Sequence, residues 1–169
     1  MMLLAATLLA FAPGCGYHLQ GAGNPRFSDP ALRMDVPPFA NESVIPDAGS
    51  YLAARLREEL RRGGFRGDFE RQRADYLVEG KVRDLREEVV SRKTDNRFAL
   101  ERRLTVVVDI RVVEVVKGRV LWKEAGLTDS VSYYSGPDAQ YTEGNRRTAF
   151  EEAARRLVLR VAQTIRVVL

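Results

Sequence analysis

LTVVVDIRV, residues 104–112, alternates in a way that decides the fold class. Its even-numbered positions are all apolar: Leu104, Val106, Val108, Ile110 and Val112. Most odd-numbered positions between them are polar or charged, with Val107 as the interruption. Successive side chains of a strand point to opposite faces, so this period of two predicts a strand with one buried face. Strands of that kind are typical of antiparallel sheets.

Further strands are expected on both sides of this stretch. Upstream, residues 75–90 place Tyr76, Val78, Gly80 and Val82 on one face of a strand. Downstream, Glu114 breaks the alternation and predicts a bulge or the strand end. Lys117-Gly118 then predicts a hairpin turn, after which residues 120–133 return as a fourth long strand. Two shorter strands are predicted nearer the N-terminus, over residues 32–36 and 65–71.

Two segments have the apolar spacing of amphipathic helices. The first is expected to begin after Asp47 as N-cap and to run to Arg62, where Gly63-Gly64 stops it. Before it, residues 38–49 predict a loop whose one large apolar anchor is Phe39. The second helix is expected to follow a loop over residues 132–145, with Asn145 as its cap, and to reach Val168.

The order of these elements is β-α-β-β-β-β-α. We therefore predict an α+β two-layer sandwich, in which a mostly antiparallel sheet of about four strands carries two helices on one face. Residues 31–169 are expected to form this single domain. Residues 15–30, rich in Gly, Asn, Pro and Ser, predict a tether before it.

The only cysteine of the sequence lies in FAPGCGYHLQG, residues 11–21. It follows an uncharged apolar run that is too short to span a bilayer and ends with small residues before Cys15. The pattern resembles a bacterial lipobox, which implies a signal peptide over residues 1–14 and acylation of Cys15. The alternatives are an ordinary signal peptide, or a buried helix with an inert thiol. Gly16 after the cysteine favours sorting to the outer membrane.

The composition argues against catalysis. The sole histidine, His18, lies in the predicted tether, where neither a catalytic triad nor a metal site could hold it rigidly. Acidic residues occur as adjacent pairs, whose side chains diverge on a helix or strand. We expect no enzyme activity, no metal, no nucleic-acid partner and no cofactor beyond the covalent lipid.

Two groups of residues are candidates for binding. Arg92, Lys93, Arg97, Arg102 and Arg103 gather at the joint between two strands, and such a cluster suits an anionic phosphate. The alternative is a solvated connection in which the arginines pair with Glu87, Glu88 and Glu101. Tyr133, Tyr134 and Tyr141 are candidates for a partner interface, or else for packing of a loop onto its own sheet.

Taken in order, the motifs resemble the LPS-assembly lipoproteins of the LptE type. The resemblance rests on GCGYHLQG, VPPFAN, LAARLREEL, ADYLVEGKV, the Val-rich strand, GRVLW and EEAARRLVLRVAQTI, and it covers Cys15 to about Val168. It implies a lipid-anchored protein on the periplasmic side of the outer membrane. It further implies that the chain plugs a large outer-membrane β-barrel, helps that barrel assemble, and binds lipopolysaccharide.

Other envelope lipoproteins are the alternative. VPPFAN after a first strand also occurs in subunits of curli-type secretion pores and in activators of peptidoglycan synthases. A pore subunit needs hairpins with a lipid-facing wall, and Asp109, Arg111, Lys123 and Asp129 on the predicted hairpin make such a wall costly.

Overall fold

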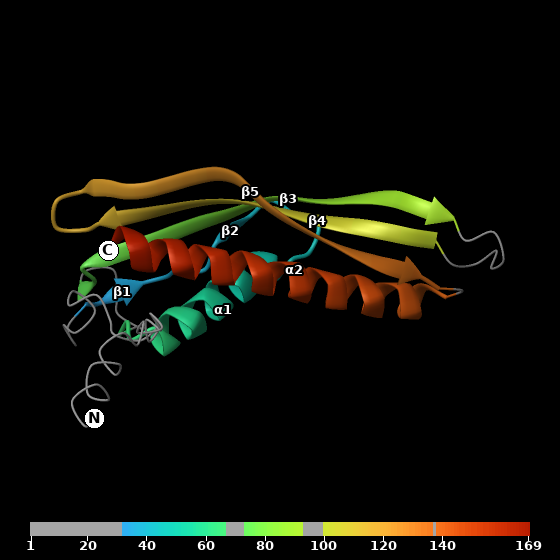
Figure 1. Cartoon of the computed structure of the whole chain (residues 1–169), viewed down its shortest axis with the longest axis horizontal. Helices are drawn as coiled ribbons and strands as arrows, with labels where there is room; N and C mark the ends of the chain where they lie inside the picture. Colours follow the sequence, from blue (N-terminus) through green and yellow to red (C-terminus); the bar gives the residue numbers. More distant parts are fainter. Residues whose placement is uncertain (1–31, 67–72, 93–99, 137) are drawn as a thin grey trace, which may run out of the picture.

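The computed structural model describes residues 32–66, 73–92, 100–136 and 138–169 (Figure 1). The predicted signal peptide and tether, including Cys15, lie outside these ranges. The elements in chain order are β1 (Met34–Asp35), β2 (Ala40–Asn41), α1 (Ala48–Arg62), β3 (Tyr76–Arg92), β4 (Leu100–Glu114), β5 (Arg119–Ser135) and α2 (Ala139–Val168).

The predicted α+β fold class is confirmed. β3, β4 and β5 form an antiparallel meander in which β4 is central. The short strands β1 and β2 both pair in parallel with β3, which makes five strands where about four were expected. Both helices lie on one face of the sheet (Figure 1).

The alternation in β4 has the predicted effect. All five even-numbered apolar side chains of residues 104–112 are buried, and they point toward the helices. Val107 is also buried, at 7 % exposure, although it lies on the opposite face. The strand ends at Glu114 as predicted, and a turn with positive φ at Gly118 leads into β5.

A bulge in β3 changes which of its side chains face the helices. The register with β4 shifts between Val82 and Asp84, so that Leu85 lies opposite Val106 and Glu87 lies opposite Leu104. An extra residue reverses the two faces of a strand. The Glu87 carboxylate therefore lies on the inner face at the far end of the sheet. Simple alternation along β3 would have placed it on the outer face.

Helix α1 has the predicted apolar stripe and the predicted end. Its stripe of Leu52, Ala53, Leu56 and Leu60 is buried, and the helix stops before Gly64, whose φ is +93°. Asp47 lies at the N-cap position, but its side chain does not cap the helix. Its carboxylate instead accepts two hydrogen bonds at 3.0 Å from the Arg147 guanidinium of α2.

The start of α2 was predicted wrongly. The helix begins at Ala139, and its cap is Asp138, whose carboxylate accepts a hydrogen bond of 2.6 Å from the Tyr141 N–H. Asn145 lies inside the helix and donates to the Tyr134 carbonyl at 2.8 Å. The first turns of α2 are mostly exposed and carry no apolar stripe, so periodicity could not reveal them.

The N-terminal strands also differ from the prediction. β1 is shorter than residues 32–36, and β2 lies within the predicted loop. Of the strand predicted over residues 65–71, Arg66 forms only an isolated parallel bridge with Arg33, and residues 67–72 lie outside the described ranges. A strand of only two residues is too short to show an alternation of apolar and polar side chains in the sequence.

The segment around Phe39 is fixed by two glycines. The Phe39 side chain is 6 % exposed and belongs to the core. A Cβ on Gly80 of β3 would lie 2.5 Å from its ring, and a Cβ on Gly49 of α1 would lie 2.2 Å from its carbonyl oxygen. Both neighbours must therefore be glycine for this close packing. Phe39 is an anchor as predicted, but it is not the one large apolar anchor of the segment, because Ile45 is buried in the core as well.

Candidate functional site

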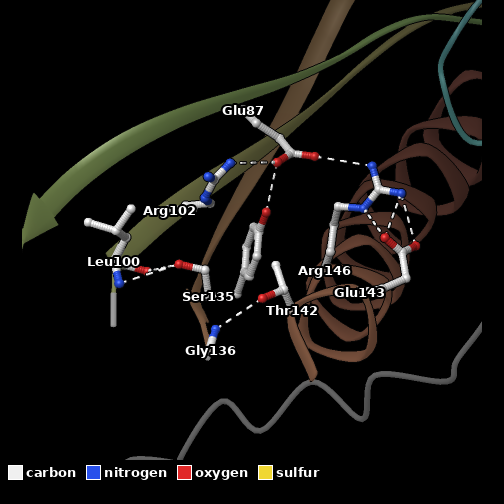
Figure 2. A network of polar contacts seen from close by, with 9 residues as sticks. Glu87, Leu100, Arg102, Ser135, Gly136, Thr142, Glu143 and Arg146 are labelled. Carbon is white, nitrogen blue, oxygen red and sulfur yellow. Dashed lines mark hydrogen bonds and ion pairs between the residues drawn. The ribbon is translucent and has the colours of Figure 1, made fainter. Parts of the chain in front are cut away.

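A network of polar side chains joins the far end of the sheet to the start of α2 (Figure 2). Its centre is Glu87 of β3, whose side chain is 22 % exposed. The carboxylate accepts from the Tyr133 hydroxyl at 2.7 Å and from the Arg146 guanidinium at 3.3 Å. Arg102 of β4 lies 3.7 Å away as an ion-pair partner.

Each cation of this network is balanced by a carboxylate. Arg146 also forms two hydrogen bonds with Glu143, of 2.8 and 2.9 Å, one turn earlier on α2. Arg102 is held less completely: its Nε is buried and has no hydrogen-bond partner within the described part of the chain. A buried donor without a partner is costly, so Arg102 is the member with unused bonding capacity.

Burial raises the pKa of the Tyr133 hydroxyl to about 12, and the hydrogen bond to Glu87 adds to the effect. The residue is 6 % exposed. Ionising the phenol would place a second negative charge beside the Glu87 carboxylate in a poorly solvated position. The network therefore depends on the protonated hydroxyl.

We expect Tyr133→Phe to destabilise the domain by about 1 kcal/mol at pH 8, the usual net contribution of one hydrogen bond. Because the folded pKa exceeds the ordinary value of 10.0, the hydroxyl's contribution is complete below pH 10 and is lost as pH rises through about 12. Urea unfolding of both proteins at pH 8 and pH 11.5 checks this. The two midpoints should converge at the higher pH; a constant gap would contradict the role of the phenol proton.

The predicted cationic cluster is divided between the two faces of the sheet. Arg102 points to the helix side and pairs with Glu87, whereas Arg103 points to the open side and lies 3.5 Å from Glu88. These are the pairings of the alternative interpretation. Both arginines nevertheless remain partly exposed, at 36 % and 45 %. The side chains of Arg92, Lys93 and Arg97 lie outside what the structure describes.

The three predicted tyrosines have different positions. Tyr133 is buried in the network, in agreement with the alternative of packing onto the sheet. Tyr134 and Tyr141 are 45 % and 55 % exposed. They line a groove of about 330 Å³ between the end of β5 and the first turns of α2, together with Asn145, Thr148 and Glu152.

Sequence reasoning missed Glu87 and Arg146 as members of a site. Glu87 was assigned only as a possible counter-ion, because its inward position depends on the bulge. Arg146 directly follows Asn145, the expected cap, and therefore lies at the predicted start of the second helix, where the sequence shows no partner for it. The signal that could have found it is Asp138, an acceptable cap three residues before Tyr141.

The described residues contain no group of three potential metal ligands. In the same ranges, no helix is long and apolar enough to cross a membrane.

Residues 32–165 match the profile of the family described as LptE, lipopolysaccharide-assembly. The chain belongs to the LptE family. The match spans most of the sequence, every described strand, α1 and all of α2 but its last three residues, so the resemblance drawn from the motifs is confirmed. The LptE family makes this chain an envelope lipoprotein of lipopolysaccharide assembly.

Two solved structures have the same fold as this LptE-family chain. A protein from Caulobacter crescentus described as a lipoprotein aligns with a TM-score of 0.55 and 17 % identity, over 85 % of this chain and 94 % of that one. The rare lipoprotein B from Shewanella oneidensis aligns with a TM-score of 0.52 and 15 % identity, over 79 % and 92 %. At these identities the similarity shows the fold alone. Among curated protein sequences none matches the chain.

Proposed function

We propose that this protein is anchored by acylated Cys15 to the periplasmic side of the outer membrane. There it occupies the lumen of a large β-barrel that moves lipopolysaccharide to the cell surface, supports assembly of that barrel, and binds lipopolysaccharide during delivery. It acts by binding and structural support and catalyses no reaction. The observation that carries the proposal is the LptE-family match over residues 32–165.

The charge distribution supports contact with lipopolysaccharide at one end of the sheet. β3 ends in Arg92, the connection to β4 contains Lys93 and Arg97, and the first residues of β4 include Arg102 and Arg103. Guanidinium groups bind phosphate in a bidentate manner, and Arg102 has a buried nitrogen with no partner in the described ranges. Val89 and Val90 at the end of β3 are 51 % and 42 % exposed, which offers apolar surface for acyl chains beside these charges.

Affinity purification tests the proposed barrel partner. Tagged full-length protein is isolated from detergent-solubilised envelopes, and the proteins that accompany it are identified by mass spectrometry. We expect one large outer-membrane barrel in near-stoichiometric amount. A self-associated ring, or a peptidoglycan synthase without any barrel, would instead support the alternative lipoprotein functions.

Charge reversal tests the proposed lipopolysaccharide contact. Replacing Arg92, Lys93 and Arg97 together by Glu should weaken binding to phosphorylated lipid A at least tenfold, because three positive charges that attract phosphate become negative charges that repel it. Binding is measured with immobilised full-length protein in detergent.

The opposite end of the sheet offers a matched control for this test. Lys117 and Arg119 beside the β4–β5 turn are exposed cations paired with Glu114. Reversing both should leave lipid A binding within about twofold of the wild-type value, since rim charges contribute little outside a site. Equal losses from the two ends would mean that the interaction follows net charge and not the cluster.

A further inference from the structure

The outer edge of β5 ends the sheet. The strand order is β1-β3-β4-β5, and no described strand pairs with β5 on the side away from β4. An edge of this kind presents N–H and C=O groups that another extended chain can bond. Whether such a chain could reach them depends on where α2 lies.

Two side chains of α2 reveal which groups of β5 point to this edge. Asn145 donates to the Tyr134 carbonyl, and Arg160 donates to the Thr128 carbonyl. In a strand, the N–H and C=O of one residue point to the same side, and the side alternates from residue to residue. Ser130 and Ser132, which have the same parity, therefore also direct their backbone groups to the edge.

The helix bonds the edge at Thr128 and at Tyr134 and leaves the stretch between these two residues open. Asn145 and Arg160 satisfy the carbonyls of Tyr134 and Thr128, whereas the edge-side groups of Ser130 and Ser132 have no backbone partner in the described ranges. Here the groove of about 330 Å³ separates β5 from α2. Ser132 thus lines a groove with a helix as its other wall, and Ser130 lies two residues away along the strand.

The groove also has exposed aromatic surface. Among the described residues, the large exposed apolar side chains are otherwise all valines, and the two exceptions, Tyr134 and Tyr141, both line this groove. Exposed tyrosines are enriched at protein interfaces because an apolar ring and a polar tip contribute together. Ser132, Asn145 and Thr148 provide neutral polar groups nearby.

We propose that the groove between β5 and α2 binds an extended segment of a partner protein, which pairs as a sixth strand with Ser130 and Ser132. Main-chain hydrogen bonds to the edge would give affinity, and an apolar or aromatic side chain of the partner would pack between Tyr134 and Tyr141. A strand added beside a helix is a known way of recognising peptides. The inference goes beyond the proposed function, since it requires neither lipopolysaccharide nor a particular barrel.

The test uses full-length acylated protein in detergent micelles and heptapeptides selected against it from a random display library. The tightest peptide is measured against wild type and Ser132→Pro. Proline removes the edge-side N–H of Ser132 but no hydrogen bond to β4, so the sheet should tolerate it. We expect Ser132→Pro to bind the peptide at least about tenfold more weakly, and Ser132→Ala, which keeps the N–H, to bind it within twofold of wild type.

Hydrogen exchange identifies the mode of binding. The Ser130 and Ser132 amides should exchange rapidly in the free protein and slow down at least tenfold with the peptide, while the ladder amides of Val131 and Tyr133 are slow in both states. A peptide N-methylated on alternate residues should not bind. No selected peptide, or peptides indifferent to Ser132→Pro and to N-methylation, would overturn the inference. A barrel that still co-purifies would leave the proposed function intact.

Discussion

Replacing Gly80 by Val is expected to destabilise the domain by about 3–5 kcal/mol, the usual cost of removing a buried phenylalanine from a core. The new Cβ would lie 2.5 Å from the Phe39 ring, which is itself 6 % exposed and packed in the core. The contact involves the Cβ itself, so no rotamer of valine avoids it. Phe39 must therefore leave its site. Urea unfolding followed by circular dichroism measures the loss.

A double mutant tests whether the loss of stability comes from the contact with Phe39 or from a general effect of valine on β3. In a Phe39→Ala background, Gly80→Val meets no ring and gains space for its methyl groups. We expect the double variant to be more stable than the sum of the two single effects by about 1–3 kcal/mol. Additive effects would show that the glycine is needed for another reason.

Gly144 in α2 provides the matched glycine control. A Cβ at this position meets nothing within 4 Å. Gly144→Ala should therefore be neutral or stabilise the domain by up to about 1 kcal/mol, because alanine is the better helix former.

Replacing Cys15 by Ala is expected to move the protein from the membrane fraction to the soluble periplasm. The acylation of Cys15 is a prediction from the sequence, and two or three acyl chains anchor a protein stably at about 0.8 kcal/mol per buried methylene. Fractionation of envelopes with immunodetection measures the distribution. Near-complete release is expected for protein produced in excess over the barrel, because the lipid is the proposed anchor of every copy that no barrel holds.

Two controls make this result interpretable. The Ser132→Ala variant, changed only at an exposed position of β5, should remain in the membrane fraction. Circular dichroism of the released Cys15→Ala protein should show the helix and sheet content of the wild type. Membrane retention of correctly folded Cys15→Ala protein that is produced in excess over the barrel would contradict the acylation.

Several elements could be predicted from the sequence because their signals are local. The alternation of residues 104–112 predicted the central strand β4 and its buried face. Helical spacing predicted α1, and Gly63-Gly64 predicted its end, since glycine without a Cβ ends a helix at little cost. The ordered motifs around these elements also predicted membership of the LptE family. Each of these inferences needed only neighbouring residues, because period and turn chemistry are properties of a short segment.

Positions that depend on distant partners could not be predicted from short segments of the sequence. Asp47 has the residue type of a cap, but Arg147, 100 positions away, takes its carboxylate. Asp138 and Asn145 are equally suitable cap residues by type. In the structure Asp138 caps the helix, whereas Asn145 donates a hydrogen bond to the end of β5.

The candidate site also depends on contacts between residues that are distant in the sequence. The bulge in β3 turned Glu87 inward and brought Tyr133 and Arg146 to it. Arg102 and Arg103 are adjacent in sequence but lie on opposite faces of β4, because successive side chains of a strand point to opposite faces of the sheet. Register and non-local hydrogen bonds are set by the packing of the whole sheet against α2, and no short segment of the sequence contains that information.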